Sequence, residues 1–363
     1  MIQIFINDKS VQAREDATIL EASYEDKYSS RQNDIKIPSV QYLKGVQQED
    51  HSSLAVCEVK GVEGLVNAST TRVTAGMEIY TKTPAVLEAQ KAALAAILDK
   101  HDLDCRACLR TGNCELQQLQ RRFRMTKEPA TAKCKTVPVE QSGIIVRDEN
   151  KCIRCGRCVA ACGKIQSIGA IEMQDGRVVP VGGAATLSQT KCVSCGQCIA
   201  VCPVGALRER DDTDRVFEAL QDPEKFVVIQ TAPAVRASIG EYFGYPIGSE
   251  TQGKLAAALR AMGFDRVFDT EFGADLTIME EASELIARMK NGGTLPLLTS
   301  CCPGWVKFCE QEFADLLPNL STCKSPTRCS ARWSRATLPK KRASPKRTSL
   351  SSPPCPARPR SSS

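Results

Sequence analysis

The feature that most constrains this chain is a pair of cysteine runs with identical spacing. Each run reads C-x2-C-x2-C-x3-C, and the two contain Cys152, Cys155, Cys158 and Cys162, and Cys192, Cys195, Cys198 and Cys202. Thiolates separated by two residues lie on one tight loop, from which three of them reach three irons of a cubane cluster. The spacing therefore predicts two 4Fe-4S sites in this part of the chain.

The fourth cysteine of each run is expected to serve the other cluster, because it lies on the helix that follows the loop, as in two-cluster ferredoxins. Two further readings of such spacing are structural zinc, for which C-x2-C pairs suffice, and disulfides. Pro203 follows the second run, whereas Gly163 stands at the matching place after the first. We assign one cluster to Cys152, Cys155, Cys158 and Cys202, and the other to Cys192, Cys195, Cys198 and Cys162.

A third candidate site lies upstream and reads His101-x3-Cys105-x2-Cys108-x5-Cys114. A lone histidine beside a helix is usually a surface or capping residue, but this cysteine spacing favours His101 as a fourth ligand. Imidazole in place of a thiolate removes a negative charge and raises a cluster's potential. The other histidine, His51, is interpreted as a solvated loop residue. Six cysteines outside the motifs are interpreted as buried or incidental thiols: Cys57, Cys134, Cys309, Cys323, Cys329 and Cys355.

Composition argues against several classes of protein. Nineteen cysteines in 363 residues are too few and too unevenly placed for a small disulfide scaffold, and their number is odd. The net charge of +6 arises beyond Pro326, since residues 1–326 hold 38 basic and 42 acidic side chains, so no nucleic-acid partner is expected. No leader pattern and no apolar run of about 18 residues is seen, so we expect a cytoplasmic protein with reduced thiols and no integral membrane segment.

Hydrophobic periodicity divides the chain into successive segments. Residues 1–82 form a sheet-rich domain, with strands expected at 2–7, 54–60 and 77–82 and a short helix at 17–22. A helix expected at 84–100 opens the one-histidine segment, 83–122, and the paired runs define a domain at 145–211. Over 224–326, strands at 227–229, 266–268 and 295–299 alternate with helices at 251–262 and 276–289, which predicts an α/β domain with a largely parallel sheet.

The last segment, 327–363, has a different composition. It holds nine Ser, six Pro and ten Lys or Arg among its 37 residues. No core can be built from such a sequence, so we expect a disordered basic tail.

The order of these motifs resembles that of the iron-iron hydrogenases, of the NADP-reducing or ferredoxin-linked type. The most specific element is the sequence Thr-Ser-Cys-Cys-Pro-Gly-Trp at 299–305, supported by Thr231–Arg236 and Phe272–Glu281. The resemblance covers about residues 1–326. It implies an α+β and α/β multidomain protein: a β-grasp domain like ubiquitin and the 2Fe-2S ferredoxins, the one-histidine segment, a bacterial two-cluster ferredoxin domain and part of an α/β hydrogenase domain.

The resemblance also implies a catalytic metal centre, the H-cluster, in which a 4Fe-4S cubane is joined to a di-iron subcluster. By this resemblance Cys302 ligates the H-cluster and Cys301 relays protons to it. Ala232 and Pro233, in the motif at 231–236, belong to the cofactor-binding set.

A proton path is suggested by Glu281, Glu284 and Arg288, which are spaced i, i+3 and i+7 and so share one helix face. Such a face is more often a solvated stripe of salt bridges. Matching positions in the resembled family form the proton path, together with a serine that matches Ser321. We therefore favour a relay, in which burial lifts the carboxyl pKa values towards neutrality.

Two departures from the family pattern are expected to matter. The four cluster positions of the 2Fe-2S domain appear here as Gln41, Ser52, Ala55 and Ser69, none of which carries a thiol, so we expect a β-grasp fold without a 2Fe-2S cluster. The two later cysteine motifs that supply the other three H-cluster ligands are also missing, so the ligand set is incomplete and the chain as written is expected to be inactive.

The basic tail has a candidate explanation in the reading frame. Residues 327–331 can be encoded by codons that, read in a shifted frame, give Gln-Met-Phe-Gly, the kind of sequence that the resembled family shows after Ser-Pro. Residues 354–359 can be encoded by codons that give Met-Pro-Cys-Thr-Ala in the same shifted frame, which is the core of the family's second cysteine motif. We therefore interpret the chain as carboxy-terminally truncated by a frameshift after Pro326. We also expect residues 224–326 to be unstable, with rapid proteolysis between Asp212 and Lys225.

The main functional hypothesis is an iron-sulfur hydrogenase subunit that passes electrons through three 4Fe-4S clusters to an H-cluster, for reversible hydrogen oxidation and proton reduction. One alternative is a non-catalytic electron-transfer protein, and another is a side subunit of the complex I type. The family resemblance implies as partners a flavin- and iron-sulfur-containing subunit that oxidises NAD(P)H, and a ferredoxin-like subunit or free ferredoxin.

Overall fold

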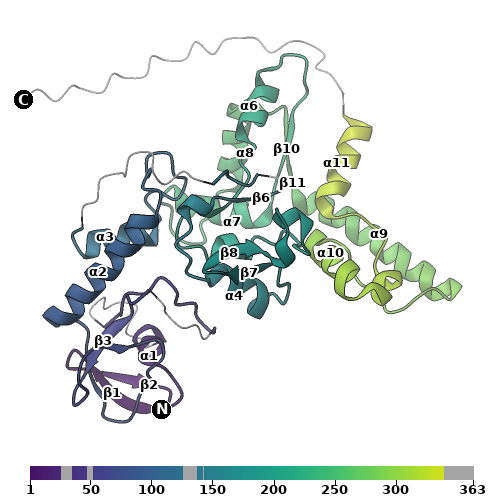
Figure 1. Ribbon diagram of the computed structural model, residues 1–363. Coiled ribbons are helices and arrows are strands. Elements are labelled where there is room, and N and C mark those ends of the chain that lie inside the picture. The colour runs from purple at the N-terminus through teal and green to yellow at the C-terminus, as the bar shows by residue number, and fades with distance from the viewer. Residues whose placement is uncertain (26–34, 47–51, 126–136, 142, 339–363) are drawn as a thin grey trace, which may run out of the picture. The chain divides into compact units, whose positions relative to one another are not determined.

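A computed structural model describes residues 1–25, 35–46, 52–125, 137–141 and 143–338. The chain divides into two compact units, residues 1–210 and 211–363 (Figure 1). His51, Cys134 and Cys355 lie outside the described residues. No helix in the described ranges has the length and apolar character needed to span a membrane.

The first unit opens with a five-stranded mixed sheet, ordered β2-β1-β5-β3-β4. β1 pairs antiparallel with β2 and parallel with β5, while β3 pairs antiparallel with β5 and β4. Ile4 and Ile6 of β1 are fully buried in one core with Ile19 and Leu20 of α1, because alternate strand residues face one side. The bounds are β1 Ile2–Ile6, β2 Lys9–Ala13, α1 Ile19–Glu25, β3 Val56–Val59, β4 Val66–Asn67 and β5 Glu78–Tyr80.

Helix α2 (Pro84–Lys100) links this sheet to the cysteine-rich part of the unit. Thr83 caps its start by accepting a hydrogen bond of 3.3 Å from the backbone N–H of Val86. Leu94 and Leu98, four residues apart on one face, are buried in a core shared with the cysteine-rich segments. The helix ends at His101, and α3 (Glu115–Arg122) follows after Cys114. These bounds match the helix expected at 84–100.

Two short antiparallel strand pairs frame the paired cysteine runs. β6 (Ile145–Arg147) pairs with β9 (Leu207–Glu209), and β7 (Ile171–Gln174) pairs with β8 (Arg177–Pro180). Helix α4 (Arg157–Ala160), continued by the π-helical turn Ala161–Ile165, carries the end of the first run, and α5 (Gln197–Ala200) carries that of the second.

The second unit alternates strands and helices. β10 (Val228–Thr231) and β11 (Arg266–Asp269) form a two-stranded parallel sheet, with Ile229 opposite Val267. Around them lie the helices α6 Thr213–Gln221, α7 Pro233–Tyr242, α8 Gln252–Ala261, α9 Thr270–Asn291, α10 Pro303–Glu312 and α11 Pro326–Thr337. The strand expected at 266–268 and the helix expected at 276–289 lie within β11 and α9. The strand expected at 227–229 and the helix expected at 251–262 overlap β10 and α8, with ends that differ by one or two residues.

The third strand expected in this unit, at 295–299, does not form. Pro296 has no backbone N–H to donate to a ladder, and Leu298 makes a single bridge to Leu320. The N–H of Leu298 donates to Asn319 and its carbonyl accepts from Ser321, at 2.8 and 2.7 Å. The segment is therefore held by a loop at 319–321 instead of by a neighbouring strand.

The expectation that residues beyond Pro326 build no core is wrong for 327–337. These residues form most of α11, which packs against α9 (Figure 1). Trp333 meets Phe272 and Phe268 edge to face, at centroid distances of 4.9 and 5.9 Å. The approach is close, because a Cβ on Gly273 of α9 would lie 2.3 Å from the carbonyl oxygen of Pro326. The aromatic side chain of Trp333 thus packs a segment of polar average composition against α9. Residues 339–363 lie outside the described ranges.

Candidate metal centres and proton path

The two cysteine runs fold into loops of the same shape. In the first, Arg154 has φ +58° and Gly156 has φ +74°; in the second, Ser194 has φ +58° and Gly196 has φ +75°. In each loop the backbone N–H two residues after the first cysteine donates to its sulfur at 3.4 Å, from Arg154 to Cys152 and from Ser194 to Cys192. Donors aimed at sulfur stabilise a thiolate, which is the form that binds iron.

The thiols fall into two groups that exchange their fourth members. Burial, with a contribution from negative charge on Cys202 and Cys152, raises the pKa of Cys155 to about 12. Burial also raises the pKa of Cys198 to about 12, with Cys192, Cys162 and Cys195 adding to the rise. Because such effects fall off with distance, Cys155 lies near Cys202 and Cys198 lies near Cys162, in each case a cysteine of the other run. Burial also raises the pKa of Cys158, with contributions from Cys155, Cys152 and Cys202, and also from Cys198.

The first of these groups surrounds a cavity. Its lining includes Cys152, Cys155, Cys158 and Cys202 together with apolar side chains such as Ile153, Val178 and Leu207. Within the described ranges, no three His, Cys, Asp or Glu side chains form a group that could hold one metal ion. A cubane does not require that convergence, because each of its ligands binds a different iron. Four thiols around an apolar cavity thus fit a 4Fe-4S cluster.

The upstream candidate site begins where α2 ends. The side chain of His101 is 6 % exposed, and its Nδ1 has no hydrogen-bond partner among the described atoms. Burial, together with the nearby charge of Lys151, lowers the pKa of His101 to about 4, so the ring is neutral at pH 7, as a metal ligand must be.

The three cysteines of this site lie near one another. Cys114 is buried at the start of α3, and burial raises its pKa, with further increases from charges on Cys108 and Cys105. Lys151 connects the histidine to this group, because its charge interacts with both His101 and Cys108. The donor set and its burial fit a cluster held by one imidazole and three thiolates.

The four positions that match a 2Fe-2S site lie in the amino-terminal sheet domain. Ala55 is buried, and Gln41 is 8 % exposed. Ser69 donates to Oδ1 of Asn67 at 2.7 Å, while Ser52 accepts from the N–H of Leu54 at 3.3 Å. The two serine hydroxyls thus take part in local hydrogen bonds.

In the second unit, Glu284 on α9 is the centre of a dense polar network. Its Oε1 accepts hydrogen bonds from Arg288, through Nη2 at 2.6 Å and Nε at 3.1 Å. Its Oε2 accepts from the hydroxyl of Ser321 at 2.9 Å and from the backbone N–H of Thr322 at 3.0 Å. The structure therefore brings together three of the residues expected on the proton path.

The expectation that burial lifts the pKa of this carboxyl is wrong for Glu284. Burial does act to raise the pKa of Glu284, but hydrogen bonds from Arg288, Ser321 and Thr322 outweigh it and leave the pKa below its ordinary value. Arg288 also donates to the carbonyls of Thr294, Pro318 and Leu320. Because a guanidinium stays charged at all ordinary pH values, Arg288 holds the carboxylate in place and is not itself a proton carrier.

Among the remaining expected residues of this unit, Glu281 lies within α9, whereas Cys302, Ala232 and Pro233 lie at helix starts. Glu281 accepts a hydrogen bond of 3.4 Å from the N–H of Ser300, the residue directly before Cys301. Cys302 caps α10, and both Cys301 and Cys302 are exposed. Ala232 caps α7, and Pro233 is its first residue. The described contacts place Glu281 next to the segment that carries Cys301.

Two groups in this unit are missing from the sequence-based site. Thr322 donates to Glu284 through both its N–H and its hydroxyl, and only its position beside Ser321 could have pointed to it. Arg236 pairs with Asp269 and Glu271, which ties α7 to the start of α9. The motif at 231–236 ends at this arginine, but its partners lie more than thirty residues away.

Comparison with known proteins matches profiles of four families to successive parts of the chain. They are the 2Fe-2S iron-sulfur cluster binding domain (1–84), the NADH-ubiquinone oxidoreductase-G iron-sulfur binding region (90–129), the 4Fe-4S dicluster domain (151–206), and the C-terminal domain of the iron only hydrogenase large subunit (225–360).

Individual relatives show the same order. The chain is 42 % identical to NADP-reducing hydrogenase subunit HndD of Solidesulfovibrio fructosivorans, over 90 % of this chain and 57 % of that protein. It is 43 % identical to iron hydrogenase 1 of Clostridium pasteurianum, over 90 % of this chain and 56 % of that protein. Over 90 % of its length the chain is therefore similar to iron-only hydrogenases. A component of an NADH-quinone oxidoreductase of Rhizobium meliloti is 31 % identical, over 48 % of this chain and 20 % of that protein.

The hydrogenase relationship extends over both units, whereas the relationship to the NADH-quinone oxidoreductase covers about half of the chain. The chain spans a little over half the length of the two hydrogenases that it matches. It is a mixed α/β protein with 2Fe-2S-ferredoxin-like, 4Fe-4S and hydrogenase regions.

Proposed function

We propose that this chain is the electron-transfer part of an iron-only hydrogenase and carries three 4Fe-4S clusters. The observation that carries the proposal is the apolar cavity lined by Cys152, Cys155 and Cys158 of the first run together with Cys202 of the second. The three ligand sets would be His101 with Cys105, Cys108 and Cys114; Cys152, Cys155 and Cys158 with Cys202; and Cys192, Cys195 and Cys198 with Cys162.

When bound, such clusters supply one-electron carriers whose potentials depend on nearby charge, hydrogen bonds to sulfur and exposure to solvent. The chain's own residues set these conditions. The N–H groups of Arg154 and Ser194 are aimed at sulfurs, and apolar side chains such as Val178 and Leu207 keep water from the first cavity.

The hydrogenase region would supply one thiolate and part of a proton path. We infer from the family that Cys302 is a ligand of the H-cluster, that Cys301 exchanges protons at that site, and that Ala232 and Pro233 line it. The hydrogen bond between Ser300 and Glu281 supports a route from Cys301 into α9, and the one between Ser321 and Glu284 supports its continuation. These residues can bind and move protons, and reversible hydrogen chemistry is the activity that they would serve.

We also propose that the amino-terminal domain keeps a β-grasp fold without a 2Fe-2S cluster. Support comes from the parallel pairing of β1 with β5 at the centre of the sheet, and from the absence of thiols at 41, 52, 55 and 69 in the sequence. The family profile matched at 1–84 describes a cluster-binding domain, so iron analysis decides this point.

Partners follow from the relatives. One of them is described as an NADP-reducing hydrogenase subunit. We propose that this chain likewise works beside a flavin- and iron-sulfur-containing subunit that oxidises NAD(P)H, and beside a ferredoxin-like subunit or free ferredoxin, in the cytoplasm.

The deciding experiment is iron analysis with EPR of the full chain, purified without oxygen and reconstituted with iron and sulfide. Three cubanes give about twelve irons per chain, a further 2Fe-2S cluster gives about fourteen, and an assembled H-cluster adds about six. Cys202→Ser and Cys162→Ser should each remove about four irons, whereas Cys57→Ser, which alters a buried thiol of the sheet domain, should remove none. Full iron content in both of the first two variants would refute the ligand sets.

A further inference from the structure

The one-histidine site and the first ferredoxin site are in direct contact through a short loop. Arg110 donates to the carbonyl of Cys202 at 2.7 Å, and the N–H of Glu115 donates to the carbonyl of Pro203 at 3.0 Å. A Cβ on Gly205 would lie 2.7 Å from the sulfur of Cys108. The backbone that follows a ligand of one site therefore touches a ligand of the other.

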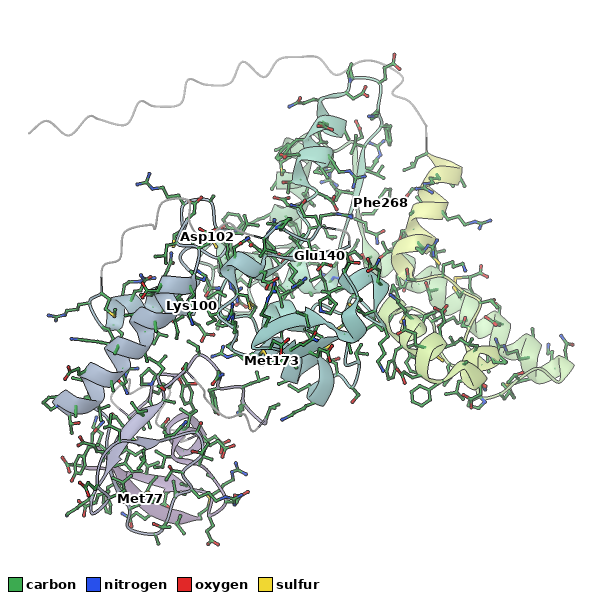
Figure 2. All side chains as sticks on the ribbon, in the orientation of Figure 1. Met77, Lys100, Asp102, Glu140, Met173 and Phe268 are labelled. Carbon is green, nitrogen blue, oxygen red and sulfur yellow. The ribbon has the colours of Figure 1, made fainter. Side chains whose placement is uncertain are left out.

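A buried ion pair spans the same two sites. Nζ of Lys151 lies 3.0 Å from Oδ2 of Asp102, and the two side chains are 12 % and 9 % exposed (Asp102 is labelled in Figure 2). Asp102 follows His101 in the sequence, and Lys151 precedes Cys152. The N–H of Asp102 also donates to the carbonyl of Asn150 at 3.0 Å. Each partner is thus joined covalently to a ligand of a different site.

A second pair repeats this arrangement. Arg157 makes a bidentate contact with Glu115, at 2.7 and 2.9 Å. Arg157 precedes Cys158, and Glu115 follows Cys114, so this pair also joins neighbours of ligands from the two sites. Glu115 is 44 % exposed, however, so solvent screens this pair more than the one between Lys151 and Asp102.

The charge of Lys151 faces the one-histidine site. Asp102, Asp148 and Cys108 are the groups that act on it, and it acts in turn on His101. A fixed positive charge stabilises the more negative, reduced state of a nearby cluster, and a fixed negative charge does the opposite. In a poorly solvated place these opposing effects are strong, and removing one partner leaves the other uncompensated.

We propose that Lys151 and Asp102 are positioning residues for electron transfer, which hold the one-histidine site against the loop at 202–205 and set the balance of charge that tunes its potential. This inference rests on the proposed function, because it requires clusters in both sites.

The test is an EPR-monitored redox titration of the reconstituted full chain and its variants. Lys151→Met removes the positive charge that faces Asp102 and should lower the midpoint potential of one cluster. Asp102→Asn leaves Lys151 unpaired and should raise the potential of that same cluster. Lys151→Arg keeps the charge and should leave the potential near that of the unmodified chain. Lys60→Met, which breaks an exposed ion pair with Glu78 in the sheet domain, is the matched control and should change no potential.

The two opposite variants separate tuning by charge from general damage. A merely structural role would shift both potentials in one direction or reduce the iron content of both, and either result would overturn the proposal. Unchanged potentials with full iron would also overturn it. If one variant loses iron, the other variant decides the test: a shift of its midpoint potential in the expected direction supports the proposal, and a shift in the opposite direction overturns it. Fewer than three clusters in the unmodified chain would instead show that the proposed function is wrong.

Discussion

Ser321 donates a hydrogen bond of 2.9 Å to Oε2 of Glu284, and its hydroxyl also accepts from the N–H of Cys323 at 3.1 Å. Its side chain therefore joins α9 to the loop that precedes α11. Because the acceptor is charged and the hydroxyl is buried, Ser321→Ala should lower the free energy of unfolding of the second unit by about 2 kcal/mol.

This change is measurable selectively, because both tryptophans of the chain, Trp305 and Trp333, lie in the second unit. Urea unfolding followed by tryptophan fluorescence gives the difference. Ser283→Ala is the matched control, since Ser283 on the same helix is exposed and bonds only the carbonyl of Met279 among the contacts described. Equal losses in the two variants would contradict the role of Ser321.

The lowered pKa of Glu284 makes a prediction about acid. Its folded-state pKa lies below the ordinary value of 4.5, so the carboxylate adds stability above pH 4.5, and this contribution is lost as the pH falls through the folded-state value. The urea midpoint of the second unit should therefore fall from pH 5 downward, and Glu284→Gln should flatten that dependence. Parallel pH profiles for the two proteins would show that Glu284 does not couple folding to protonation.

Gly205 is predicted to accept no side chain. Its φ is outside the left-handed region, so the obstacle to Gly205→Ala is space alone: the new Cβ would lie 2.7 Å from the Cys108 sulfur. We expect a loss of about 1–3 kcal/mol from overpacking, together with a lower iron content of the one-histidine site. Iron analysis and thermal unfolding report the two effects. Gly253→Ala, at a helical glycine with open space around it, is the control and should be neutral or slightly stabilising.

Trp333 is predicted to anchor α11. Trp333→Ala removes its edge-to-face contacts with Phe272 and Phe268 (Figure 2 labels Phe268) and should destabilise the second unit by about 2 kcal/mol. Circular dichroism during thermal unfolding measures the loss, and limited proteolysis should show faster cleavage within 326–337. Arg332→Ala, at an exposed position of the same helix, should change neither. If the tryptophan variant behaves like this control, α11 does not depend on the aromatic contact.

The sequence predicts those parts of the fold that depend on local periodicity. The alternation of Ile4 and Ile6 indicates β1, and the spacing of Leu94 and Leu98 indicates α2, because in each case a single face is buried. β2 is not among the predicted elements, because Lys9–Ala13 shows little apolar alternation and is held mainly by its pairing with β1. The cysteine spacing predicts the two loops because each loop is local, whereas the exchange of the fourth cysteines is expected only from the likeness to two-cluster ferredoxins.

The sequence does not predict features that depend on distant contacts. Glu284 and Arg288 are four residues apart and their pairing could be foreseen, but the donors Ser321 and Thr322 come from more than thirty residues away. Together with Arg288, these donors lower the pKa of Glu284, which reverses the expected shift. Likewise the docking of Trp333 depends on Phe272, which the composition of 327–363 does not reveal.

The pairing of β6 with β9 brings residues 145 and 209 side by side, although 63 positions separate them in the sequence. A domain whose entry and exit strands are neighbours can be inserted into a longer chain, or removed from it, without forcing the flanking segments apart. This geometry suits the region to serve as an interchangeable part. It gives a physical reason why proteins with different catalytic domains can share the same iron-sulfur domain.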